Sequence, residues 1–196
     1  EDRQLAELPE PPGFVGQLRP YQRRRFAWLT FMRQHGLGAC LADDMGLGKT
    51  IHTTALFLHD RAEGRGGTVL IVCPASPQIK WREEMRDRFG LDFRIVDSEL
   101  MKDLRRRLGI HVNPWNHFPR LITSMDYLKR ERPLRLFREL LPAEGESVYP
   151  RRFDLLVIDE GHNIAPSGSQ YYAVDSQRTE MVRALAPHFE HKLFLT

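Results

Sequence analysis

Cysteine is scarce in this 196-residue chain, which has only Cys40 and Cys73. This excludes a disulfide-rich scaffold and a metal or redox site of the Cys-x-x-Cys kind, because each needs more cysteines or a closer spacing. Both cysteines lie in apolar, strand-like runs. We therefore expect them to be reduced core residues of a cytosolic protein.

Long apolar runs are also missing. No stretch offers the roughly 20 consecutive apolar residues that a membrane-spanning helix needs, and residues 1–3 do not resemble the start of a secretory signal. We therefore expect a cytoplasmic protein. The formal net charge of +3 and the pI of about 9.0 permit nucleic-acid contact without requiring it. Arginine runs at 23–25, 105–107 and 151–152 could line a nucleic-acid path, although solvated surfaces carry such runs more often.

What the chain does have is a regular alternation of strand and helix patterns, over a length that suits one domain with a substantial core. Apolar strand patterns occupy residues 39–42, 68–73, 93–96, 121–123, 155–159 and 193–196. Helical patterns occupy residues 20–34, 48–60, 77–89, 99–108, 133–140 and 176–189. This alternation predicts an α/β fold with a mostly parallel sheet and helices on both faces.

Two segments, 111–119 and 163–175, fit neither pattern and are interpreted as long loops. Such loops in a compact domain are usually functional or mobile. The Pro-rich residues 1–17 predict an extended leader ahead of a domain at 18–196.

Residues 41–50, LADDMGLGKT, have the form of a phosphate-binding loop between a strand and a helix. Gly46 and Gly48 let the backbone turn tightly and bring its N–H groups against phosphate oxygens. The following helix directs its positive end at the same anion. Lys49 would neutralise the β- and γ-phosphates, and the Thr50 hydroxyl would hold Mg²⁺. An aspartate stands where the general pattern has its first glycine, so this stretch alone could be a chance helix start.

The second half of this candidate site is the stretch 153–160, FDLLVIDE, an apolar run that ends in two carboxylates. This pattern is typical of a buried parallel strand with acidic residues at its carboxyl end, which is where α/β sheets bind ligands. Asp159 would approach the Mg²⁺, and Glu160 would orient and deprotonate the water that attacks the γ-phosphate. Such acidic pairs also occur as solvated loop residues, so the pairing with the phosphate loop is what favours an ATP site.

Several further motifs follow one another in order along the chain. They read LRPYQ at 18–22 with Trp28 after it, DMGLGKT at 44–50, VCPAS at 72–76 with Trp81 and Glu84 after it, LITSMDYL at 121–128, DEGH at 159–162 and FLT at 194–196. Together they resemble the Swi/Snf-type branch of superfamily-two helicases, which are double-stranded DNA translocases. Gly161 stands where that family more often has alanine. The long loop after the acidic box is similar to that of bacterial members.

The resemblance implies a RecA-like P-loop lobe with ATP and Mg²⁺ as cofactors. Gln22 would select adenine, because an amide offers one donor and one acceptor to the edge of that base, and Arg19 and Tyr21 would support it. The implied phosphate contacts are Asp44, Met45, Gly46, Leu47, Gly48, Lys49 and Thr50. The implied catalytic residues are Lys49, Asp159, Glu160 and His162, of which His162 would link the nucleotide state to the DNA-facing motifs. A zinc site at His162 is the rival interpretation, but it lacks ligands at a suitable spacing.

The implied contacts to duplex DNA come from two strand ends. They are Pro74, Ala75 and Ser76 after one strand and Thr123 and Ser124 after another. Each group offers N–H and hydroxyl donors that suit a phosphate. Ordinary helix N-capping by serine and threonine is the alternative for each. Trp81 is expected in the core, because a protein that tracks phosphates has little need of aromatic platforms for bases.

The resemblance also implies a second RecA-like lobe that carries arginine fingers and half of the DNA groove. The chain reaches Thr196 inside a motif, so we expect a first lobe that hydrolyses almost no ATP by itself, within a protein that could belong to a larger complex. Three functions stay open at this point. They are a DNA-dependent ATPase that translocates on duplexes, a strand-separating helicase, and a catalytically silent nucleotide-binding scaffold. The intact loop and acidic box argue against the scaffold.

Overall fold

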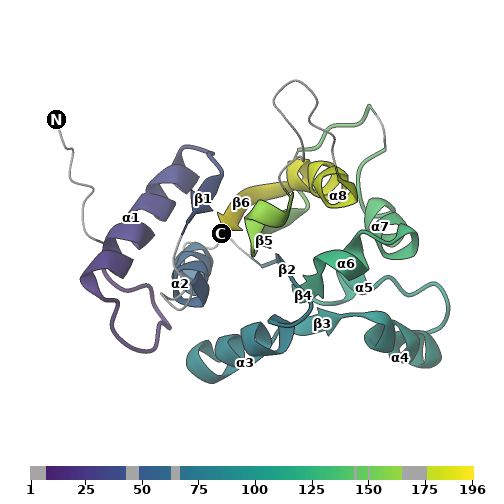
Figure 1. The fold of residues 1–196 in the computed structure, drawn as a ribbon, viewed down its shortest axis with the longest axis horizontal. Helices are drawn as coiled ribbons and strands as arrows, with labels where there is room; N and C mark the ends of the chain where they lie inside the picture. Colours follow the sequence, from purple (N-terminus) through teal and green to yellow (C-terminus); the bar gives the residue numbers. More distant parts are fainter. Residues whose placement is uncertain (1–7, 43–48, 63–66, 144, 150, 165–175) are drawn as a thin grey trace.

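The computed structural model describes residues 8–42, 49–62, 67–143, 145–149, 151–164 and 176–196. Within these residues six strands form one sheet in the order β1-β6-β5-β2-β4-β3, and every neighbouring pair is parallel (Figure 1). The strands are β1 (Ala39–Leu41), β2 (Val69–Cys73), β3 (Arg94–Val96), β4 (Arg120–Ser124), β5 (Phe153–Ile158) and β6 (Phe189–Leu195). The predicted α/β fold with a parallel sheet is confirmed.

Helices cover both faces of this sheet (Figure 1). On one face α1 (Pro20–Gln34), α2 (Lys49–Ala62) and α3 (Gln78–Phe89) pack in one apolar cluster. On the other face α5 (Pro114–His117), α6 (Met125–Leu128), α7 (Glu131–Arg138) and α8 (Gln177–Leu185) pack in a second cluster. The remaining helices are α4 (Ser98–Leu108) and the short 3₁₀ helices η1 (Gly161–Ile164) and η2 (Ala186–His188). None of the described helices is long and apolar enough to cross a membrane.

The central strands β2 and β5 explain why the sequence forms this sheet. All residues of β2 are buried, and along the strand they alternate between the two clusters: Ile71 packs on one face and Leu70 on the other. In β5, Val157 packs on the same face as Ile71, and Leu156 packs on the same face as Leu70. A strand that is covered on both faces needs an unbroken apolar run, which is what these segments contain.

The end of the chain differs from the prediction. The helical pattern at 176–189 is broken, because α8 stops at Leu185, η2 follows, and β6 begins at Phe189 rather than at 193. Pro187 lacks the backbone N–H that would continue a helix. Phe189 is fully buried and its ring stacks 5.0 Å from the ring of Phe153 on the neighbouring strand. The segment from Phe189 onward pairs in parallel with β5, and at its far end with β1, so it forms a strand.

The segment 111–119 is not an open loop. It contains α5, and Trp115 is buried there, with its indole N–H donating to the Pro133 carbonyl oxygen at 3.0 Å. Asn113 caps α5 by accepting from the Trp115 N–H at 3.1 Å, and its amide donates to the Leu136 carbonyl oxygen. The segment therefore closes the core beneath α7. Most of the other predicted loop, residues 165–175, lies outside the described residues.

One cysteine prediction is confirmed and the other is wrong. Cys73 is buried at the end of β2, where burial in the first place and the charge of Asp159 in the second raise the pKa of its thiol to about 12. Cys40 is exposed. It lies in β1, an edge strand whose two other residues point into the core while Cys40 points away from it.

Candidate nucleotide-binding site

The candidate site lies along the carboxyl edge of the sheet. Cys73 at the end of β2 is in register with Ser124 at the end of β4, and Val72 is in register with Ile158 at the end of β5. The Asp159 N–H continues this pairing by donating to the Val72 carbonyl oxygen at 2.8 Å. Parallel strands thus bring three predicted motifs, far apart in the sequence, to neighbouring positions on one edge.

The phosphate loop itself lies mostly outside the described residues. Asp44, Met45, Gly46, Leu47 and Gly48 fall in the undescribed stretch 43–48. Its two flanks have the predicted form, because β1 ends at Leu41 and α2 begins at Lys49. Near the start of α2, the Thr54 hydroxyl donates to the Thr50 carbonyl oxygen at 2.7 Å. The loop therefore joins a strand end to a helix N-terminus, as an anion-binding loop does.

Asp159 is a buried carboxylate, 6% exposed, immediately after β5. Its Oδ1 accepts from the Glu160 N–H at 2.9 Å, and its Oδ2 accepts from the Trp81 indole N–H at 3.0 Å. These two donors orient the carboxylate. Trp81 is in the core as expected, but its bond to Asp159 was not predicted. An indole N–H seldom stays unpaired when buried, which is the signal that could have suggested it.

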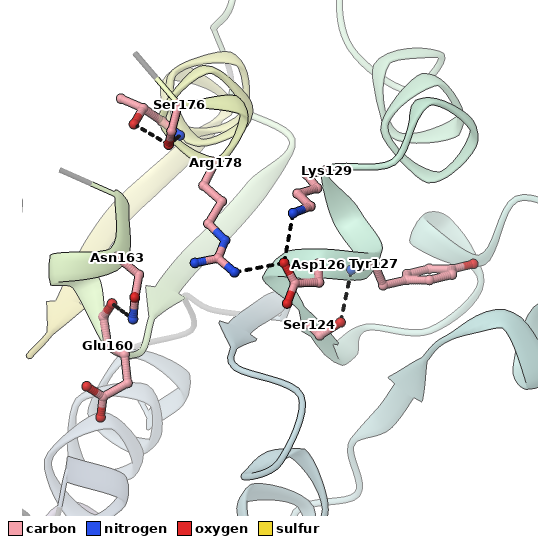
Figure 2. A network of polar contacts seen from close by, with 9 residues as sticks. Ser124, Asp126, Tyr127, Lys129, Glu160, Asn163, Ser176 and Arg178 are labelled. Atoms are coloured by element: carbon pink, nitrogen blue, oxygen red, sulfur yellow. Dashed lines mark hydrogen bonds and ion pairs between the residues drawn. The ribbon is translucent and has the colours of Figure 1, made fainter. Parts of the chain in front are cut away.

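Glu160 has a strained backbone. Its φ of 54° lies in the left-handed region, where a residue other than glycine costs of order 1–3 kcal/mol. Asn163 holds this turn in place, because both its backbone N–H and its side-chain amide donate to the Glu160 carbonyl oxygen, at 2.9 and 3.1 Å (Figure 2). Backbone strain of this kind collects at functional sites. No local sequence pattern predicts this turn.

His162 lies next to both the acidic box and the end of β6. Its Nδ1 is 3.5 Å from Glu160 Oε2 and 3.5 Å from the Thr196 hydroxyl oxygen. These are long contacts, at the limit of hydrogen bonding. The Thr196 N–H in turn donates to the Leu41 carbonyl oxygen at 3.1 Å, directly before the phosphate loop. His162 is thus placed between the acidic residue and the strand end that borders the loop.

Gly161, the departure from the family pattern, has room for a methyl group. A Cβ there would lie 3.4 Å from the Leu195 carbonyl oxygen and 3.6 Å from Phe194 Cβ, which is ordinary van der Waals contact. Its φ is not positive, so we expect Gly161→Ala to raise the free energy of unfolding by about 0.4–1 kcal/mol, through a less flexible unfolded chain. Thermal unfolding measures this change as a higher Tm.

The control for Gly161→Ala is Gly90→Ala at the end of α3. Gly90 has a φ of 63° and open space around it, so alanine there is strained by about 1–2 kcal/mol and should lower the Tm. A fall in Tm for both variants would contradict the space inferred at Gly161.

The predicted adenine motif forms the start of α1. Gln22 is 4% exposed, and its Oε1 accepts from the Arg19 N–H at 2.9 Å, so it closes a capping box at the helix N-terminus. Tyr21 is half-buried, with the Arg25 guanidinium 5.4 Å from the centre of its ring. Arg19 is exposed.

The start of α1 lies against the helix that follows the phosphate loop. Leu18 and Phe26 pack in a small cluster with Ala55 and Ile51 of α2. Upstream, Glu10 accepts from the Leu18 N–H at 3.3 Å and from the Arg23 guanidinium at 2.8 Å. The motif therefore packs on α2, and its role in reading adenine stays a prediction.

The predicted DNA contacts fall into two groups. Ala75 and Ser76 are exposed and Pro74 is half-buried, in the turn between β2 and α3. Ser124 caps α6 by accepting from the Tyr127 N–H at 3.0 Å, which is the alternative considered from the sequence. Thr123 is fully buried, and its hydroxyl donates to the Val96 carbonyl oxygen of β3 at 2.9 Å. Because this hydroxyl is engaged inside the sheet, we leave Thr123 out of the proposed DNA path.

Residues 21–188 match the family described as the SNF2-related domain. YwqA of Bacillus subtilis (strain 168) is 52% identical over 83 residues, which are 42% of this chain and 9% of YwqA. The RNA polymerase-associated protein RapA of Serratia proteamaculans (strain 568) is 32% identical over 164 residues, which are 84% of this chain and 15% of RapA.

A solved structure is also similar, the Sulfolobus solfataricus SWI2/SNF2 ATPase core in complex with dsDNA. The TM-score is 0.69 at 28% identity, over 97% of this chain and 34% of that chain. The chain therefore spans a small part of the curated relatives and about a third of the solved one.

Proposed function

The chain belongs to the SNF2-related domain family, and on this premise we propose that it is the ATP-binding lobe of a motor that hydrolyses ATP to translocate along double-stranded DNA. Membership confirms the Swi/Snf-type resemblance, and the likeness to the Sulfolobus ATPase core confirms the RecA-like fold. The observation that carries the proposal is the single sheet edge where the loop flank, the acidic box and the strand ends of β2 and β4 meet. Relatives from both bacteria and an archaeon match, so a bacterial origin stays a prediction.

ATP would lie across this edge, with its phosphates at the loop before Lys49 and its adenine at Gln22, Tyr21 and Arg19. The oxygens of Thr50 and Asp159 fit Mg²⁺, a hard cation that proteins bind through one or two oxygen side chains and the phosphates of the substrate. Within the described residues no group of three or more His, Cys, Asp or Glu side chains could hold a metal by itself. Bound Mg²⁺ would neutralise charge on the phosphates.

Glu160 would orient and deprotonate the attacking water. Its side chain is 29% exposed, so solvent can reach it, while the turn held by Asn163 fixes its backbone. The Trp81 indole N–H and the Glu160 N–H would keep the Asp159 carboxylate oriented toward the phosphates. His162, next to both Glu160 and Thr196, would respond to the state of the nucleotide.

Duplex DNA would lie over the turns that follow β2 and β4. The exposed Ser76 and the backbone N–H groups of this turn suit phosphate oxygens, which a translocase tracks without reading bases. Several of the basic runs are already engaged with acids, such as Arg23 with Glu10 and Arg107 with Asp103. We therefore assign the DNA path to the sheet edge rather than to the arginine runs.

A second RecA-like lobe would complete the site. This chain matches 34% of the Sulfolobus ATPase core chain, which leaves room for such a lobe in the intact protein. Arginine fingers supplied by another lobe are worth about 10³–10⁵ in rate. The lobe described by this chain should therefore hydrolyse ATP only very slowly when isolated.

The test is ATP hydrolysis by the intact protein that carries this chain, with and without duplex DNA. We expect strong stimulation by duplex, and its loss in Lys49→Ala, because the variant removes the positive charge at the β- and γ-phosphates. Arg106→Ala, an exposed residue of α4, is the control for the loss of one positive charge.

Two other outcomes of this test would point to a different function. The absence of hydrolysis with any nucleic acid would reject the motor and leave a nucleotide-binding scaffold. Stimulation together with the release of a labelled strand from a duplex would indicate a strand-separating helicase instead.

A further inference from the structure

An ion pair joins α8 to α6 across the face of the sheet. The Arg178 guanidinium donates to Asp126 Oδ1 at 2.8 Å, and Lys129 Nζ lies 3.0 Å from the same oxygen (Figure 2). Hydrogen bonds from Arg178 first and Lys129 second lower the pKa of the Asp126 carboxyl. Lys129 is in the same local turn as Asp126, whereas Arg178 comes from a different helix. Arg178 therefore makes the contact between α8 and α6.

At one end, α8 is tied to the acidic box. The Thr179 hydroxyl, one residue after Arg178, donates to the Ile164 carbonyl oxygen at 2.8 Å at the end of η1. Asn163, the residue before Ile164, holds the Glu160 carbonyl oxygen. Ser176 caps α8 by accepting from the Thr179 N–H at 3.2 Å. The first turn of α8 is thus fixed to the strained turn of the acidic box.

At the other end, Asp126 lies in α6, which follows Ser124 at the end of β4. Met125 and Leu128 of α6 pack in the same apolar cluster as Met181 and Val182 of α8. Apolar packing holds the two helices together but is not directional. The ion pair adds a direction, because it links one atom of α8 to one atom of α6.

We propose that Arg178 is a positioning residue that couples the acidic box to the DNA-facing end of β4. The inference rests on the proposed function and adds to it the element that joins the two sites. A shift of Glu160 on ATP binding would move η1, η1 would move α8 through Ile164 and Thr179, and Arg178 would move α6. Coupling of this kind is reciprocal, so duplex binding would act on Glu160 through the same contacts.

The same structure predicts that the pair contributes little to stability. The side chains of Arg178 and Asp126 are 33% and 49% exposed, and ion pairs at such sites add little to the free energy of folding. Removal of Arg178 should therefore change coupling while the lobe stays folded.

The test uses the intact protein and compares Arg178→Ala, Asp126→Ala, the double variant and Lys129→Ala. For Arg178→Ala and Asp126→Ala we expect the DNA-free hydrolysis rate and the Tm to stay near those of the unchanged protein. The stimulation by duplex should fall about threefold to tenfold. In the double variant the stimulation by duplex should be no lower than in either single variant, because both substitutions remove the same interaction. Lys129→Ala removes a positive charge from Asp126 without breaking the contact to α8, so its stimulation should be retained.

A second readout is the affinity for duplex with and without a non-hydrolysable ATP analogue. The ratio of the two affinities should approach one in Arg178→Ala and should recover in the charge-swapped pair Arg178→Asp with Asp126→Arg. Equal stimulation in Arg178→Ala and in the unchanged protein would overturn the inference while the proposed function stands. Additive losses in the double variant would also overturn it. If the unchanged protein is not stimulated by duplex, it is the proposed function that fails.

Discussion

Replacing Glu160 with glutamine should lower the rate of duplex-stimulated ATP hydrolysis by about 10²–10⁴, the usual contribution of a general base. The amide has the shape of the carboxylate but cannot accept the proton of the attacking water. ATP binding should be retained, because the proposed phosphate contacts come from the loop before Lys49 and not from Glu160. The protein should then stay in its ATP-bound form, with tight binding to duplex.

Steady-state hydrolysis and equilibrium nucleotide binding by the intact protein measure these two effects separately. Glu131→Gln is the matched control, because Glu131 is an exposed carboxylate in the first turn of α7. A Glu160→Gln rate within threefold of the unchanged protein would show that another group activates the water. Loss of ATP binding together with hydrolysis would indicate that Glu160 acts in binding.

The second large effect is expected at Trp81. Trp81→Ala should lower the free energy of unfolding by about 3–5 kcal/mol, because it empties the space of a buried indole. That is a large fraction of the roughly 5–15 kcal/mol that stabilises a typical domain. Unfolding in urea measures the loss.

Trp81→Phe separates packing from the bond to Asp159. It keeps an aromatic ring in the cluster but removes the N–H that orients the carboxylate, at a cost of about 1–3 kcal/mol. We expect a smaller loss of stability than for alanine, together with weaker Mg²⁺-dependent ATP hydrolysis. Trp28→Phe is the control, since Trp28 is only partly buried against the same cluster. Hydrolysis that is unchanged in Trp81→Phe would contradict an orienting role for the indole.

The candidate site could be predicted from the sequence to the extent that its parts are local. The end of β5 and the carboxylates after it form one continuous run, so Asp159 and Glu160 could be placed at a strand end without any tertiary information. The start of α1 was predicted at the correct residue because Pro20 suits the first helical position. Each of these features depends on residues close together in the chain.

Contacts between distant residues could not be predicted from the sequence. The bond from Trp81 to Asp159 joins residues 78 positions apart. The helical pattern at 176–189 includes Phe189, which in the structure begins β6 and stacks on Phe153. The sequence also does not show that the Thr123 hydroxyl donates to the Val96 carbonyl oxygen of β3. In each case the partner belongs to another element, and no local pattern encodes which elements become neighbours.

The sequence by itself thus determined the class of fold and predicted which residues form the site. Apolar runs of strand length, separated by helical patterns, require a parallel sheet that is covered on both faces. The motifs at 72–76, 121–128 and 159–162 each begin in or directly after one of these runs. The tertiary structure alone decided how the strands are arranged. The strand order β1-β6-β5-β2-β4-β3 brings Asp159 beside Trp81, and the packing of α8 on α6 brings Arg178 to Asp126. Both contacts depend on which helices and strands pack together. That packing is driven by the burial of apolar surface, which is non-directional and therefore does not specify in the sequence which elements become neighbours.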